Sequence, residues 1–227
     1  MLSFIKFIQI PVISTSFLVL ANAGNLKKPT CPADMVAVNS NTCIDKYEWP
    51  NKKGELPLVG ASGLPEPRDI KNKEIWDADS LCKSVGKRVC WADEWVKACR
   101  GKNNSPYPWG SQVPRYIPGE FDSHLACNFG KQYIGPDEYK IYLRDKKEMA
   151  RLDLREPSGE RNQCKSEVGA FDMVGNVEEW VRCRSKTGWC LAGRYWSELY
   201  RCDQLIGSHA PKWHYYQSGF RCCKDLK

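Results

Sequence analysis

Apolar residues recur at helical spacing in two neighbouring segments between residues 75 and 101. The first segment is followed by Gly86, and its apolar residues, three or four positions apart, are Ile75, Ala78, Leu81, Cys82 and Val85. In the second segment, which is followed by Gly101, one helix face carries Trp91, Trp95, Ala98 and Cys99. Asp93 and Glu94 fall in its first turn, where acids suit the helix dipole. The pattern predicts two consecutive helices.

Short apolar runs bounded by turn residues predict strands on both sides of these helices. The runs cover residues 35–38, 43–45, 47–49, 168, 177–182, 191–195 and 219–222. Residues 52–67 are rich in Gly and Pro and are expected to form a loop. Residues 102–166 are expected to be mostly loop, with a short helix around 145–154. Two helices combined with many short strands and long loops predict an α+β fold.

The first 23 residues have the pattern of a secretory signal peptide. Lys6 supplies a positive charge, an apolar stretch covers 7–20, and an Ala-Asn-Ala motif ends at Ala23. Polar residues and a proline interrupt the stretch, so no stable membrane anchor is expected. The alternative is an uncleaved N-terminal anchor. We expect a signal peptide at 1–23, a single domain at 24–227, and an exported protein, periplasmic or secreted.

Cysteine is abundant and even in number, which favours disulfide bonds in an exported chain. Zinc binding, the alternative, expects CxxC pairs or close Cys/His clusters, and the sequence contains none. A Cys31–Cys43 bridge would close the first predicted hairpin. The predicted disulfide residues are Cys31, Cys43, Cys82, Cys90, Cys99, Cys127, Cys164, Cys183, Cys190, Cys202, Cys222 and Cys223.

The formal net charge is +7, and acidic and basic residues are interleaved along the chain. A nucleic-acid-binding protein would show a one-sided basic stripe. We therefore expect no nucleic-acid partner.

Six motifs, in order, resemble those of the formylglycine-generating enzyme (sulfatase-modifying factor) family. The most informative is Phe171-Asp-Met-Val-Gly-Asn-Val-Glu-Glu-Trp180. The others are Cys43-Ile-Asp-Lys-Tyr-Glu48, the two-helix segment 76–101, Tyr107-Pro-Trp-Gly110, Ala126-Cys-Asn128 and Gly219-Phe-Arg-Cys222. The resemblance spans about residues 35–222. It implies the sulfatase-modifying-factor variant of the C-type-lectin-like fold, with little regular secondary structure.

The resemblance also implies two disulfide pairs, Cys82–Cys222 and Cys99–Cys202. For the remaining residues we expect Cys90–Cys223, Cys127–Cys164 and Cys183–Cys190, with unpaired buried thiols as the alternative.

The oxidases of this family use two cysteines that follow a Gly-Gly-Ser strand and bind copper(I), which soft thiolates suit. The equivalent segment here, 192–202, contains one cysteine, Cys202, and it matches the structural position. Ser197 matches the nearer catalytic cysteine, and the other has no counterpart. We therefore assign no catalytic residue and do not expect copper. Cys183 and Cys190 could serve as a substitute pair, but a structural disulfide is the favoured reading.

Calcium is the cofactor that the resemblance leaves open. Some family members bind it through the Asn/Gly turn of the longest motif, where Asn176, the backbone of Val177 and Glu179 would supply oxygen ligands here. The alternative is that Asn176 adopts a left-handed conformation and Glu179 forms an internal ion pair. The sequence does not decide between them.

Aromatic residues gather late in the chain, where the family places its substrate groove. They are Trp189, Tyr195, Trp196, Tyr200, Trp213, Tyr215 and Tyr216. Aromatic side chains can contact a sugar or a peptide, or they can fill a core. We expect most to be buried and one or two to be exposed. The predicted substrate-binding residues are Arg194, Tyr195, Trp196, Ser197 and Trp213.

Three functions are compatible with these features. The first is an exported binding module for a peptide or a glycan that lacks formylglycine-generating activity. The second is an oxidoreductase of the same family that oxidises a protein or a siderophore at a divergent site. The third is a purely structural envelope protein. The missing cysteine pair favours the first, without deciding whether the protein is an enzyme.

Overall fold

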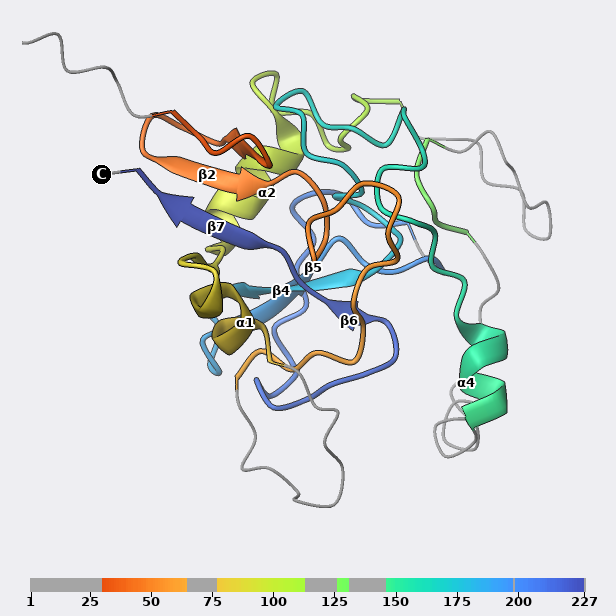
Figure 1. Ribbon diagram of the computed structural model, residues 1–227. Helices are drawn as coiled ribbons and strands as arrows, with labels where there is room; N and C mark the ends of the chain where they lie inside the picture. Colours follow the sequence, from red (N-terminus) through yellow and green to blue (C-terminus); the bar gives the residue numbers. More distant parts are fainter. Residues whose placement is uncertain (1–29, 65–76, 113–125, 131–145, 198, 227) are drawn as a thin grey trace, which may run out of the picture.

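The computed structural model describes residues 30–64, 77–112, 126–130, 146–197 and 199–226 (Figure 1). The predicted signal peptide and Ile75 lie outside these residues. The N-terminal elements are β1 (Met35–Ala37), β2 (Thr42–Asp45), α1 (Ala78–Ser84), β3 (Arg88–Val89) and α2 (Ala92–Arg100). The later elements are α4 (Lys146–Leu152), β4 (Glu178–Arg182), β5 (Trp189–Ala192), β6 (Ser218–Gly219) and β7 (Cys222–Asp225). In the described part of the chain, no helix is long and apolar enough to cross a membrane.

Two small sheets organise the described residues. The first has the order β1-β2-β7-β3, with every neighbouring pair antiparallel. The C-terminal strand β7 therefore lies between two strands from the first half of the chain; Figure 1 shows it beside β2. The second sheet has the order β5-β4-β6, in which β4 pairs antiparallel with β5 and parallel with β6.

Both predicted helices are present, and local hydrogen bonds set their ends. The Asp77 carboxylate accepts a hydrogen bond from the Ser80 amide at 2.7 Å and caps the N-terminus of α1. At the start of α2, the Glu94 carboxylate accepts from the Trp91 amide at 2.8 Å. Gly86 and Gly101 follow the two helices with φ of 67° and 64°, a conformation that glycine adopts without steric cost.

Two of the predicted strands are wrong. Residues 47–49 form a turn, because the Asn51 side chain accepts from the Tyr47 amide and the Asn51 amide donates to the Glu48 carbonyl. Val168 lies in a turn that the Gly169 amide closes by donating to Ser166, and Gly169 has a φ of 98°. In both places the hydrogen bonds of a turn replace those of a sheet.

The core consists of two main hydrophobic clusters, one on each side of β4. Trp95, Val181 and Met173 belong to the first, and Trp180, Trp189 and Phe220 to the second. Trp95, Trp180, Trp189 and Trp196 are among the largest fully buried side chains. Each aromatic side chain removes about 150–250 Å² from water, which compensates for the small amount of regular secondary structure.

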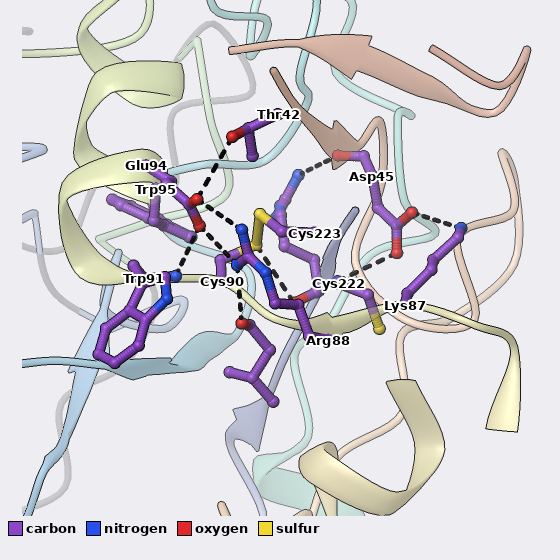
Figure 2. The surroundings of a disulfide bond; sticks show 12 residues. Thr42, Asp45, Lys87, Arg88, Cys90, Trp91, Glu94, Trp95, Cys222 and Cys223 are labelled. Carbon is purple, nitrogen blue, oxygen red and sulfur yellow. Dashed lines mark hydrogen bonds and ion pairs between the residues drawn. A yellow bond between two sulfur atoms is a disulfide. The ribbon is translucent and has the colours of Figure 1, made fainter. Parts of the chain in front are cut away.

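All twelve cysteines are joined in six disulfides: Cys31–Cys43, Cys82–Cys222, Cys90–Cys223, Cys99–Cys202, Cys127–Cys164 and Cys183–Cys190. These are the pairs expected from the sequence and the resemblance. Adjacent cysteines of β7 bridge to α1 and to the residue after β3, so β7 is fixed twice to the helical segment. Figure 2 shows the second of these bridges, Cys90–Cys223.

Charged side chains surround the bridges of β7. Arg88 pairs with Glu94, and Lys87 pairs with buried Asp45 at 2.6 Å (Figure 2). Arg88 also pairs with Asp225 of β7. Burial raises the pKa of Asp45, and the hydrogen bond from Lys87 opposes this shift. Ion pairs of Lys87 and Arg88 therefore hold the first sheet together in addition to the disulfides.

Candidate functional site: a buried polar cluster and an aromatic groove

The longest motif folds into a tight turn that precedes β4. Asp172, Gly175 and Asn176 have positive φ values of 54°, 79° and 56°. A Cβ atom at Gly175 would lie 2.2 Å from the backbone oxygen of Asn128, so only glycine fits there. The Asn176 amide donates to the same oxygen at 2.8 Å. The turn is thereby attached to the segment that contains Asn128.

Glu179 of β4 faces inward and forms a buried ion pair. Its carboxylate accepts from Arg221 Nε at 2.7 Å and from Arg221 Nη2 at 2.6 Å, and it also accepts from Trp95 Nε1 at 2.7 Å. Arg221 and Glu179 are each about 1% exposed. Charge-assisted, two-point contacts of this kind are the stronger hydrogen bonds in proteins. The pair joins β4, α2 and the Gly219-Phe-Arg-Cys222 motif.

Two further buried acids lie beside this pair. Glu48 accepts from Ser158 Oγ at 2.6 Å and from Asn176 Nδ2 at 2.9 Å, and Asp172 accepts from the Gly159 amide at 2.7 Å. Burial raises the pKa of Asp172 to about 7. Burial, together with the charge of Asp172, raises the pKa of Glu48 well above its ordinary value. These acids therefore retain protons at pH values where free carboxyl groups are ionised.

Two of the three residues predicted to bind calcium, Asn176 and Glu179, already use their side-chain oxygen atoms within the protein. Asn176 Oδ1 accepts from Asn128 Nδ2 and from the Glu156 amide, and both Glu179 oxygens accept from Arg221. Asn176 is left-handed and Glu179 is ion-paired, as in the alternative set out from the sequence. In this arrangement the residues do not fit a calcium shell. Calcium binding at the turn stays a prediction.

The segment that corresponds to the family's catalytic strand lacks, among its described residues, the free thiols that the family's copper site uses. Cys202 is bonded to Cys99, and Cys183 is bonded to Cys190. Ser197 is 8% exposed, and its Oγ has no hydrogen-bond partner among the described residues. A bis-thiolate copper(I) site needs two free thiols. The side chains present therefore do not fit that site.

An open groove of about 460 Å³ lies between α4 and the chain that enters β6. It is lined by Val59, Gly60, Ala150, Asp153, His214, Tyr215 and Tyr216, which we call the aromatic groove. The Tyr216 ring packs against two other rings, with its centroid 5.8 Å from that of Trp196 and 5.5 Å from that of Tyr215. Burial raises the pKa of Tyr216, so its hydroxyl stays protonated and can donate a hydrogen bond.

The predicted substrate-binding residues pack against the two tyrosines that line the groove, some against Tyr216 and one against Tyr215. Tyr195 and Trp196 contact each other and pack beneath Tyr216, whereas Trp213 stacks on Tyr215 at 5.0 Å. Arg194 covers the rings of Tyr195 and Tyr200 and reaches Glu178. None of these predicted residues lines the aromatic groove directly.

The exposure of the late aromatics differs from the expectation. Trp189, Tyr195 and Trp196 are buried. The other four, Tyr200, Trp213, Tyr215 and Tyr216, are half-buried. Fewer than half are therefore buried and none is exposed; Trp213 and Tyr216, for example, are half-buried and pack against the buried clusters.

Sequence reasoning assigned no role to several residues that build this region. Glu48 and Arg221 were part of the recognised motifs, and a charged residue inside an otherwise apolar motif is a usable signal for a buried pair. Val59, Gly60 and Asp153 carry no such signal. They reach the groove because separate loops converge there.

Comparison with known proteins places this geometry in a family. Residues 46–226 match the model of the family described as sulfatase-modifying factor enzyme 1-like domain. A curated relative, the uncharacterized protein YfmG of Bacillus subtilis (strain 168), is 28% identical over 123 residues. That match covers 50% of this chain and 23% of YfmG, so the chain spans about a quarter of its curated relative.

Two solved structures are similar to this chain at low sequence identity. The Major Tropism Determinant I1 variant has a TM-score of 0.52 at 11% identity, over 87% of this chain and 54% of its own. PvdO from Pseudomonas aeruginosa has a TM-score of 0.47 at 20% identity, over 82% of this chain and 80% of its own. With the family match, the α+β fold expected from the resemblance is confirmed.

Proposed function

Because the chain belongs to the sulfatase-modifying factor enzyme 1-like domain family, we propose that it is an exported member that binds a peptide or a glycan and does not generate formylglycine. The observation that carries this proposal is the pairing of Cys202 with Cys99, with Ser197 at the position of the nearer catalytic cysteine. A serine hydroxyl cannot replace a thiolate as a copper(I) ligand.

The aromatic groove supports a binding role. Its volume of about 460 Å³ falls within the usual range of ligand sites, about 300–1,000 Å³. Tyr215 and Tyr216 offer flat apolar faces, and Asp153, whose carboxylate is paired with Arg155, adds a charged group to the lining. Rings of this kind bind a sugar face or a peptide side chain, while polar groups set the orientation.

Six disulfides support export. Disulfides form and persist in oxidising compartments and are rare in the cytosol. We propose a periplasmic or secreted location, to be checked by fractionating cells that produce the full chain.

The binding role is tested by screening the purified protein against peptide and glycan libraries and then measuring Kd for the ligands found. Tyr216→Ala removes a groove ring and should weaken binding about tenfold or more, since a contacting aromatic ring typically contributes more than 1 kcal/mol. Val85→Ala is the control, because it removes an exposed apolar side chain that does not line the groove. Equal losses in the two variants would contradict the groove assignment.

The second half of the proposal has its own test. The oxidised protein, incubated with copper and a Cys-x-Pro-x-Arg peptide, should leave the peptide cysteine unchanged by mass spectrometry. Conversion of that cysteine to formylglycine would overturn the proposal and favour an oxidoreductase.

A further inference from the structure

We propose that the turn between β4 and β5 forms a second binding surface, one for acidic polysaccharides that carry carboxylate or sulfate groups. The surface consists of Arg184 and Lys186 of the turn, Arg182 at the end of β4, and the neighbouring Trp91 before α2. We call these four residues together the basic turn. None of these residues lines the aromatic groove, so this inference goes beyond the proposed function.

The basic turn has a fixed backbone. The Cys183–Cys190 disulfide joins its two ends, and the Cys183 amide donates to the Gly188 carbonyl at 3.1 Å. Ser185 Oγ and Thr187 Oγ1 both donate to the Trp189 carbonyl, at 2.8 and 3.1 Å. A ligand therefore meets a preorganised turn and loses little affinity to ordering it.

This hydrogen bonding separates the side chains of the turn into two sets. Ser185 and Thr187 are partly buried and bonded to the turn itself, whereas Arg184 and Lys186 between them are exposed. Two cations are therefore presented together toward solvent.

A third cation and an exposed indole extend this surface. The backbone of Trp91 forms an isolated β-bridge with that of Arg182, and Trp91 is 47% exposed. The Arg182 guanidinium lies 4.5 Å from the Trp189 ring centroid and 6.0 Å from that of Trp91. The two indoles hold the cation by cation–π contacts, which leave its N–H groups available to an anion.

The cations of the basic turn differ from others in the protein in their ion pairing. Lys87, Arg88 and Arg221 each contact a carboxylate of the protein. For Arg182, Arg184 and Lys186, the described residues contain no such carboxylate within ion-pair distance. Their positive charge is therefore not neutralised by a described acid and is available to an anionic ligand.

A linear anionic polymer of sugar rings matches the two kinds of group on this surface. Trp91 offers an exposed indole face on which a sugar ring can lie, and the Arg182 guanidinium lies beside it. A polysaccharide chain can follow the cations and place one sugar face on the indole. Its anionic groups would then meet the guanidinium and ammonium groups.

The test compares dextran sulfate and polygalacturonate with neutral dextran, using the oxidised full-length protein and biolayer interferometry at several salt concentrations. We expect both acidic polymers to bind and neutral dextran not to bind. Arg184→Ala/Lys186→Ala should weaken binding about tenfold and reduce the slope of log Kd against log salt by about one to two. Trp91→Ala should weaken binding with little change in that slope, because it removes no charge.

Lys53→Ala/Lys102→Ala is the matched control, since it also removes two exposed positive charges and lies outside the basic turn. An equal loss in this control would show a net-charge effect and overturn the proposal, as would tighter binding to anionic phospholipid vesicles than to the polymers. Tyr216→Ala should leave polymer binding unchanged. A loss in Tyr216→Ala alone would assign the polymer to the aromatic groove and overturn the basic turn.

Discussion

Arg221 is fully buried beside three acids, Glu48, Asp172 and Glu179. Its guanidinium contacts Glu179 at two points and reaches the backbone carbonyls of Asp45 and Asp172. Moving ions out of water is costly, and the cost is recovered only where hydrogen bonds satisfy both partners. A single residue of the Gly219-Phe-Arg-Cys222 motif therefore balances the charge of the whole polar cluster.

We predict that Arg221→Met destabilises the protein by about 3–5 kcal/mol, because Glu179 would remain buried without its partner. Arg88→Met breaks a half-exposed pair with Glu94 and should cost about 1 kcal/mol or less. Urea unfolding, followed by tryptophan fluorescence with the disulfides intact, measures both. Similar losses in the two variants would contradict this account of the buried pair.

At the scale of elements, the helices and strands are too short to be stable alone. α1 has 7 residues and α2 has 9, whereas isolated helices need about 12–15 to be even marginal in water. Their positions depend on β7, which is bonded to α1 through Cys82–Cys222 and to the residue between β3 and α2 through Cys90–Cys223. Since the two bridges connect nearly the same parts of the chain, each limits the unfolded chain even when the other is absent.

We therefore predict that the two bridges are partly redundant. With its neighbour intact, each closes a loop of only about 10 residues, so Cys82→Ala/Cys222→Ala and Cys90→Ala/Cys223→Ala should each cost about 2–3 kcal/mol. Removing both bridges should exceed the sum of these losses by about 1 kcal/mol, because a much longer loop is then released. A double-mutant cycle from urea unfolding measures the difference, and strict additivity would refute redundancy.

For the whole molecule, the buried acids link stability to pH. In the folded state the pKa of Asp172 is about 7, against an ordinary value of 3.8, and the pKa of Glu48 is also raised. Between these values the folded protein holds protons that the unfolded chain releases. Stability is therefore greatest below this window and falls as pH rises through it.

The predicted measurement is the free energy of unfolding in urea between pH 5 and pH 8.5. It should decline with rising pH in the wild type, and less steeply in Asp172→Asn, whose amide resembles the protonated acid. Asparagine also tolerates the left-handed backbone at this position. A rise in wild-type stability across the range, or an unchanged slope in the variant, would be inconsistent with protons held by this cluster.

The sequence alone indicated the helices, the strands β1, β2 and β4 and part of β5, because apolar spacing and turn residues are local properties, and its motifs indicated the family. It did not predict β3, and the single strand expected at 219–222 is divided between β6 and β7 in different sheets. The sequence also indicated the loss of the catalytic cysteine pair, since a missing residue type is visible without a structure. The strands expected at 47–49 and Val168 were wrong because side-chain hydrogen bonds and a positive φ form turns there. Such bonds leave little trace in an apolar pattern.

Only the tertiary structure decided where the side chains of distant segments meet. Glu48, Asn176 and Arg221 lie far apart in the sequence and share one buried cluster, and Val59, Asp153 and Tyr216 come together to line the groove. Burial and the proximity of other charges, which set the pKa of Asp172, are likewise properties of the folded chain. These contacts arise from the packing of loops fixed by six disulfides, and no local sequence pattern specifies how loops converge.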